Sequence, residues 1–183
     1  MSIVITAASG QLGRLVVQGL LRRAVAPADI VAGARSLDSI KDLAETGVRT
    51  AVLDYDQPDT VAAAVSQGDT LVLISGNDLA NRDRQHADVI AAANGAGAGH
   101  LVYTSGLRAS DSSSPIAASH AATEDAVRTG GIPFTLLRNG WYTENYAHSM
   151  AAVRSTAVQR RRGPGRLRHP AGPRRGHRSG RHR

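Results

Sequence analysis

Short apolar runs alternate with amphipathic stretches from residue 3 to residue 137. The apolar runs are rich in β-branched residues and predict six strands: Ile3–Thr6, Ile30–Ala34, Val48–Leu53, Thr70–Ile74, Leu101–Thr104 and Phe134–Leu137. The stretches between them predict helices: Leu12–Arg22, Leu37–Glu45, Pro58–Val65, Arg82–Ala93 and Ser119–Arg128. Strict alternation predicts a parallel sheet with helices on both faces, and therefore strands that are apolar throughout.

Six such units predict a Rossmann-type, doubly wound α/β sheet in three layers, with ligands bound at the carboxyl ends of the strands. The helix boundaries carry local signals. Ser36 and Asp56 are expected to be N-caps, and Gly47 and Gly68 stand where helices should stop.

The charge pattern divides the chain in two. Residues 1–153 hold eleven Lys or Arg and all fifteen Asp and Glu, a net −4, whereas residues 154–183 hold eleven Arg and no acid, a net +11. We therefore expect a nucleotide-binding domain over 1–153 and a disordered basic tail over 154–183. A basic arm for nucleic acid is one interpretation of the tail. Out-of-frame translation of a GC-rich gene is favoured, because Lys and aromatic residues are absent there.

Composition excludes several kinds of protein. The chain has no cysteine, which removes disulfides and thiolate sites and fits a reducing cytoplasm. No apolar run reaches membrane-spanning length and no signal peptide is evident. His86 has no partner at a metal-ligand spacing, so we expect it on a helix surface or at a cap, and we expect no metal site.

The stretch ITAASGQLG, residues 5–13, joins the first strand to the first helix through a glycine turn. Gly10 permits close approach of a phosphate, and Gly13 lets the helix lie on the strand. Ala7 stands where a dinucleotide fingerprint has its first glycine, and it suits the turn only at a negative φ. An ordinary strand–helix turn is the alternative.

Three polar residues at later strand ends are candidates for the same site. Arg35 follows the second strand, where an arginine pairs with a 2′-phosphate and selects NADP(H); a solvated surface arginine is the alternative. Asp54 faces the adenine or caps the next helix. Ser105 is placed to donate a hydrogen bond to a reacting carbonyl, or else it simply ends its strand.

The stretches ITAASGQLG, DYDQP, QHADVIAAANGAG and LLRNGWYTENY together resemble the NmrA-like atypical short-chain dehydrogenase/reductases, and most closely the bacterial NAD(P)H:quinone oxidoreductases. The resemblance implies that the pyrophosphate lies on Ala7, Ala8, Ser9, Gly10, Gln11 and Leu12, and the 2′-phosphate on Arg35. It also places a cofactor loop at Gly76, Asn77, Asp78 and Asn81. The nicotinamide end falls on Asn139, Gly140, Trp141, Tyr142, Thr143 and Glu144, with Asn139, Trp141 and Tyr142 positioning the ring and substrate.

Two departures from the family pattern shape the expected chemistry. The superfamily's Tyr-x-x-x-Lys positions hold Ile116 and His120. His120 is expected on the helix surface, with a contact to the cofactor ribose as the alternative. The arginine tail stands where the family has the part that closes over the substrate.

Without the tyrosine, reduction of a ketone lacks its acid, whereas the weakly basic oxygens of a hydroquinone take protons from water. The expected function is therefore NADPH-dependent, two-electron reduction of a quinone or a similar electrophile, weakened by loss of the substrate-covering part. A non-catalytic, NADP(H)-sensing regulator is the alternative.

Overall fold

The computed structural model describes residues 1–110, 114–144 and 146. Residues Met1–Trp141 form one compact unit, called here the sheet domain, and a second unit begins at Tyr142. The predictions for residues 154–183 lie outside the described residues.

Six parallel strands form one sheet in the order β3-β2-β1-β4-β5-β6. Their bounds are β1 Ile3–Ile5, β2 Ile30–Ala34, β3 Arg49–Val52, β4 Thr70–Leu73, β5 His100–Gly106 and β6 Phe134–Asn139. The order reverses between β1 and β4, so their carboxyl ends border the crevice in which doubly wound sheets bind ligands. The Rossmann-type prediction is confirmed.

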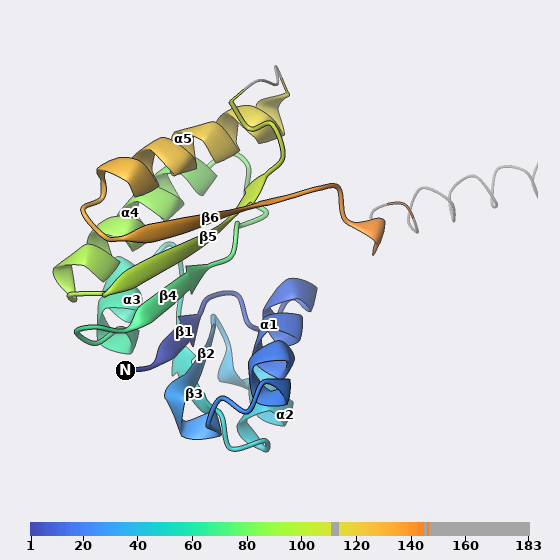
Figure 1. Cartoon of the computed structure of the whole chain (residues 1–183), viewed down its shortest axis with the longest axis vertical. Coiled ribbons are helices and arrows are strands. Elements are labelled where there is room, and N and C mark those ends of the chain that lie inside the picture. The colour runs from blue at the N-terminus through green and yellow to red at the C-terminus, as the bar shows by residue number, and fades with distance from the viewer. Residues whose placement is uncertain (111–113, 145, 147–183) are drawn as a thin grey trace, which may run out of the picture. The chain divides into compact units, whose positions relative to one another are not determined.

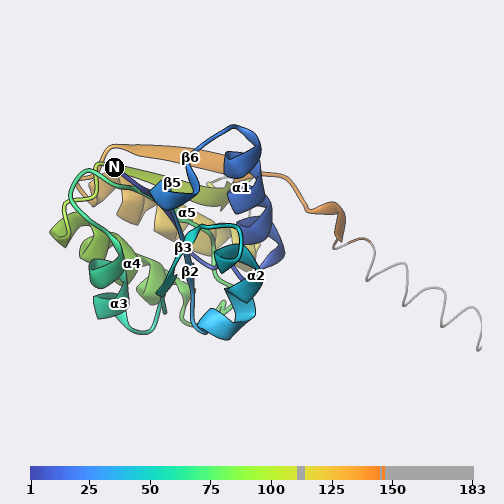
Figure 2. The same cartoon turned by 90° about the horizontal axis from the view of Figure 1, so that it is seen from below.

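Helices cover both faces of this sheet. Their bounds are α1 Gln11–Arg22, α2 Lys41–Ala44, α3 Pro58–Ala64, α4 Arg82–Gly95 and α5 Pro115–Thr129, with 3₁₀ turns at Pro27–Asp29 and Leu37–Ile40. Figures 1 and 2 show α1 and α2 on one face and α3, α4 and α5 on the other. No helix among the described residues combines the length and apolar character needed to cross a membrane.

Alternation along the strands builds two cores. In β4, Leu71 and Leu73 pack with residues of α3, α4 and α5, whereas Val72 packs with residues of α1 and α2. Successive side chains of a strand point to opposite faces, so a continuously apolar run supplies both cores at once.

The expectation that every strand is buried fails at β3 and β6. Val52, Phe134 and Leu137 are among the exposed large apolar residues. Both strands are at edges of the sheet, where a strand has a neighbour on one side only.

The helix-stop predictions are confirmed, and Ser36 is confirmed as an N-cap, whereas the prediction of Asp56 as an N-cap is wrong. Gly47 and Gly68 follow α2 and α3 with φ of 84° and 83°, a region that glycine adopts without strain. Ser36 occupies the N-cap position of the 3₁₀ turn Leu37–Ile40, although its side chain makes no cap hydrogen bond. Asp56 lies before the cap position of α3, which is Gln57. Its carboxylate instead accepts hydrogen bonds from the side chain of Arg84 on α4, at 2.7 Å, and from that of Gln85, at 3.0 Å.

Candidate functional site

The turn after β1 places backbone amides at the switch point of the sheet. Ala8 is buried and its amide donates to the Gly33 carbonyl of β2 at 2.8 Å, which ties the turn to the neighbouring strand. Ala7 has φ of 48°, so the expectation of a negative φ is wrong. The chain must reverse sharply here to enter α1, and Ala7 adopts the left-handed conformation that a glycine would take at less cost.

Gly13 brings α1 close to this turn. A Cβ at Gly13 would lie 2.4 Å from the Ala7 carbonyl oxygen and 2.7 Å from the Ala8 Cα, so only glycine fits. Helix α1 then begins at Gln11, and the amides of Gln11 and Leu12 have no carbonyl acceptor within the described chain. Free amides at a helix N-terminus form a binding site for a phosphate.

A cavity of about 280 Å³ opens beside the turn. Seven of the residues expected in the cofactor site line it: Ala7, Ser9, Gly10, Arg35, Gly76, Asn77 and Asp78. Asp54, a candidate adenine contact or helix cap, lines it too. The cavity is thus bordered by segments that follow β1, β2, β3 and β4.

The remaining lining residues were not anticipated: Ala34, Leu53, Tyr55, Asp56, Ser75 and Gln85. Most of them stand next to a strand end that the sequence does mark. Gln85 is the exception, because it comes from α4 and only the packing of that helix brings it to the cavity. Ala8, Gln11, Leu12 and Asn81 do not line the cavity; Asn81 donates to Asp78 at 2.8 Å instead.

One side of the cavity carries opposite charges. Arg35 and Asp56 both line it, and the positive charge of Arg35 helps Arg84 and Gln85 to hold the pKa of Asp56 below its usual range. Asp54 accepts a hydrogen bond from the Asp56 amide at 3.1 Å, so it both lines the cavity and shapes the turn before α3. Described residues make no hydrogen bond or ion pair to the Arg35 guanidinium.

Side chains of α4 form hydrogen bonds with the loop that follows β4. The Gly76 amide donates to His86 Nε2 at 3.1 Å, and the Gly76 carbonyl accepts from Arg82 at 3.4 Å. His86 is fully buried, so the expectation of a surface histidine is wrong. Burial above all, with the charge of Arg82, lowers the pKa of His86 to about 3, so its imidazole is neutral.

His120 is also buried, with 9 % of its surface exposed, and its Nδ1 lies 2.7 Å from the Tyr103 hydroxyl. The expectation of a helix-surface histidine is therefore wrong. The sequence does not reveal the burial of either histidine, because it arises when their helices pack against one another and against β5. In the sequence of each helix, the histidine is a polar residue among mixed polar and apolar neighbours, and this pattern does not indicate that it is buried.

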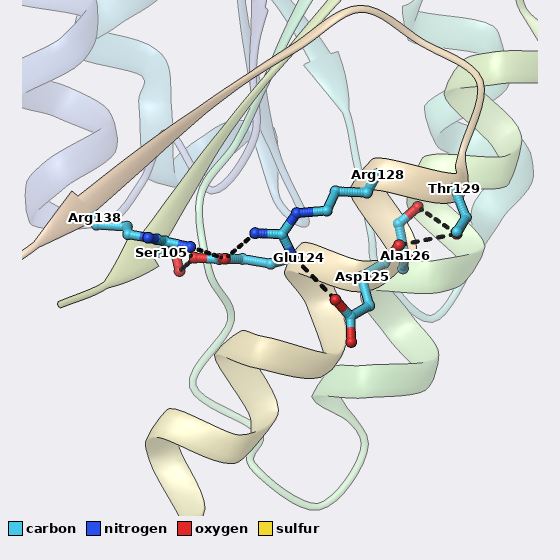
Figure 3. A network of polar contacts seen from close by, with 7 residues as sticks. All are labelled: Ser105, Glu124, Asp125, Ala126, Arg128, Thr129 and Arg138. Carbon is cyan, nitrogen blue, oxygen red and sulfur yellow. Dashed lines mark hydrogen bonds and ion pairs between the residues drawn. The ribbon is translucent and has the colours of Figure 1, made fainter. Parts of the chain in front are cut away.

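A buried ionic network joins α5 to the ends of β5 and β6 (Figure 3). Glu124 is fully buried and accepts two hydrogen bonds from Arg138 of β6, at 2.8 and 2.6 Å. Arg128 and Ser105 donate to it at 2.8 and 2.6 Å. These donors, Arg138 foremost, lower the pKa of Glu124 to about 2. The Ser105 hydroxyl is thus committed to Glu124 rather than offered to a substrate carbonyl.

The network fixes the strand from which the expected nicotinamide residues follow. Asn139 ends β6, where its carbonyl accepts from the Leu107 amide at 2.8 Å. Trp141 is 62 % exposed. Tyr142, Thr143 and Glu144 begin the second unit, in which Thr143 Oγ1 donates to Glu144 at 3.2 Å. The contacts with the nicotinamide end of the cofactor stay predictions for all six residues: Asn139, Gly140, Trp141, Tyr142, Thr143 and Glu144.

The chain belongs to the NAD(P)H-binding family, whose model matches residues 7–163. The match includes the glycine turn, Arg35 and the loop after β4. Free helix amides, glycine at the two close approaches and a cation after β2 are the donor set that a dinucleotide phosphate requires, so the residues present fit this cofactor.

Two relatives place the chain within the NmrA-like group. It is 39 % identical over 151 residues to quinone oxidoreductase 2 of Escherichia coli K12, and 31 % identical over 153 residues to an NmrA-like family domain-containing oxidoreductase of Aspergillus flavus. These alignments cover 82 % and 80 % of this chain but 52 % and 50 % of the relatives, so the chain spans about half the length of the curated relatives it matches.

Solved structures give the same result. The NADPH complex of the E. coli enzyme superposes with a TM-score of 0.79 at 39 % identity, over 85 % of this chain and 54 % of that one. A triphenylmethane reductase from Citrobacter sp. in complex with NADP(H) gives a TM-score of 0.75 at 41 % identity, over 80 % and 52 %.

Proposed function

We propose that the chain is the NADPH-binding part of an oxidoreductase that passes a hydride to a quinone or a similar electrophile. The observation that carries the proposal is the position of Arg35, which lines the same cavity as Gly10 and follows the second strand. A guanidinium there suits the 2′-phosphate that distinguishes NADPH from NADH. The identity to an NADPH-dependent quinone oxidoreductase supports the same cofactor.

Different residues of the chain would bind different parts of NADPH. The amides of Gln11 and Leu12 would hold the pyrophosphate, Arg35 the 2′-phosphate, and the loop at Gly76 the middle of the cofactor. NADPH supplies the hydride when bound. The remaining task of the protein is to hold the acceptor against the nicotinamide ring, which is the role proposed for Asn139, Trp141 and Tyr142.

A quinone is the favoured acceptor because the chain has Ile116 and His120 at the positions of the superfamily's Tyr and Lys. Hydride transfer to a quinone leaves weakly basic oxygens, which water can protonate. A triphenylmethane dye, the substrate class in the name of the Citrobacter relative, is the second candidate, because a carbon cation needs no proton at all.

The test is NADPH oxidation by the purified chain with menadione and, separately, with a cationic triphenylmethane dye. Loss of NADPH absorbance with menadione is the expected result, and preference for the dye would replace the quinone assignment. Tight NADPH binding with no turnover of either acceptor would favour the regulator. No binding of NADPH would contradict both.

A further inference from the structure

Four ring side chains lie in a row along the carboxyl ends of β3, β4 and β5. The centroids of Tyr55 and His86 are 5.8 Å apart, those of His86 and Tyr103 5.6 Å, and those of Tyr103 and His120 6.0 Å. Tyr55 lines the dinucleotide cavity at one end of the row. His120 is at the other end, against Gly106, the last residue of β5.

The hydrogen bonds of His86 assign its tautomer. Its Nε2 accepts from the Gly76 amide, so the hydrogen of the neutral ring is on Nδ1, which lies 3.0 Å from Thr123 Oγ1. Thr123 uses its own hydroxyl hydrogen on the Ser119 carbonyl at 3.1 Å. His86 is therefore fully satisfied, and it has no hydrogen to offer a ligand.

The hydrogen bonds of His120 lead to the opposite tautomer. Burial raises the pKa of Tyr103 to about 12, so its phenol keeps its hydrogen. The acceptor within hydrogen-bond distance of this phenol among the described residues is His120 Nδ1, and we take the phenol as the donor. Burial and then the charge of Arg82 lower the pKa of His120, and Glu124 opposes them, so the ring is neutral near pH 7. A neutral imidazole whose Nδ1 accepts a hydrogen bond carries its hydrogen on Nε2.

This Nε2–H group is available for a ligand. It has no partner among the described residues, and every buried polar side-chain atom of those residues has one, so Nε2 reaches the molecular surface. Gly106 lies beside the ring: a Cβ on that residue would lie 3.5 Å from Nε2 and 3.1 Å from Cδ2. A side chain at position 106 would therefore crowd this edge of the imidazole.

A buried cation lies close to the same group. Arg82 is 3 % exposed, and its hydrogen bonds in the described part go to neutral oxygens, those of Ser119, Gly76 and Ile116. Asp83, the nearest acid on its helix, bonds to Ser119 instead, and Glu124 is matched by Arg138. Arg82 therefore adds a positive charge near His120, and Glu124 acts against it.

We propose that His120 is a catalytic residue whose Nε2–H donates a hydrogen bond to the substrate oxygen that becomes negative as the hydride arrives. This inference rests on the proposed function. The quinone accepts the hydride and becomes the hydroquinone monoanion, NADPH is oxidised to NADP⁺, and the anion takes its proton from water. His120 keeps its own hydrogen throughout. A neutral imidazole of low pKa is an effective donor to such an oxygen because it does not surrender its proton.

The first test measures binding of an oxygen anion without turnover. The probe is 2-hydroxy-1,4-naphthoquinone, which is anionic at neutral pH, titrated into the complex of the chain with NADP⁺. His120→Asn keeps an acceptor for Tyr103 but lacks the Nε2 donor, and is expected to weaken binding at least tenfold. His120→Gln offers an N–H near the Nε2 position and should recover part of the affinity. His100→Gln, at the amino end of β5, is the matched control.

The second test measures turnover of menadione. Removing one such donor costs about 10²-fold or more in kcat, so His120→Asn should lower kcat with NADPH binding unchanged, and His120→Gln should restore part of it. Tyr103→Phe leaves His120 in place but frees its hydrogen to move to Nδ1, and should weaken probe binding severalfold. The absence of cysteine removes quinone arylation of thiols as a complication.

Equal probe binding by the unmodified chain and His120→Asn overturns the inference, and so does the absence of binding to the unmodified chain. Failure of the unmodified chain to oxidise NADPH with menadione overturns the proposed function instead. The binding experiment still decides the role of His120 in that case.

Discussion

At the scale of single residues, Arg35 is expected to decide which cofactor binds. Arg35→Ala should weaken NADPH binding by about 1.5–3 kcal/mol, because charged hydrogen bonds to the 2′-phosphate are lost, and should leave NADH nearly unchanged. Fluorescence titration with both cofactors is the measurement. Arg49→Ala, which removes an arginine of β3 outside the cavity, is the control. An equal loss for both cofactors would contradict the assignment.

Ala7 leads to a second prediction at this scale. A residue with a Cβ in the left-handed region costs about 1–2 kcal/mol, and the extra freedom of glycine in the unfolded chain returns part of that cost. Ala7→Gly should therefore raise the free energy of unfolding by about 0.5–1 kcal/mol and tighten NADPH binding. Urea unfolding and cofactor titration test it. Ala8→Gly, in the same turn, should destabilise, and a loss of stability in Ala7→Gly would contradict the prediction.

At the scale of elements, Glu124 connects α5 to the end of β6. Glu124→Gln removes the negative charge shared by Arg138 and Arg128 and should lower the free energy of unfolding by about 2 kcal/mol or more. The adjacent Asp125 also pairs with Arg128, but it is exposed, so Asp125→Asn should change stability by less than about 0.5 kcal/mol. Urea unfolding of both variants is the measurement, and equal losses would show that burial of the carboxylate is irrelevant.

At the scale of the whole molecule, stability should depend on pH through His86. Its pKa is about 3 in the folded chain and about 6.5 when unfolded, so below pH 6.5 the unfolded state binds the extra proton. The free energy of unfolding should then fall with decreasing pH, by up to about 1.4 kcal/mol per unit, with His120 acting in the same direction. The pKa of Glu124 is lowered, so its contribution is lost only at more acidic pH.

Urea unfolding at pH 7 and pH 5 tests this dependence. His86→Gln should flatten the change between the two pH values whatever its effect on stability at pH 7, and His100→Gln should leave it intact. A slope as steep in His86→Gln as in the unmodified chain would assign the pH dependence to other groups.

The elements were largely predictable because their signals are local. Continuous apolar runs mark Thr70–Leu73 and its neighbours as strands buried on both faces, and Gly47 marks a stop because few other residues accept its φ. The glycine turn is equally local: a Cβ at Gly13 would clash with Ala7 and Ala8, and one at Gly10 would lie 3.3 Å from the Ala7 carbonyl oxygen. Arg35 was predictable because the residue after β2 always reaches the same crevice.

The sequence by itself therefore determined the α/β order, the position of the glycine turn and the family. The tertiary structure decided which polar residues are buried and what they hold. His86, His120 and Glu124 lie on helices whose own patterns do not reveal burial, and their roles arise when α4 and α5 pack against each other and against β5. Such contacts join residues far apart in the chain: the Gly76 loop to α4, and Ser105 and Arg138 to α5. The sequence pattern shows the periodicity of polar and apolar residues within one element. It does not show which residues of other elements will contact a given side chain, because those contacts form only when the chain folds.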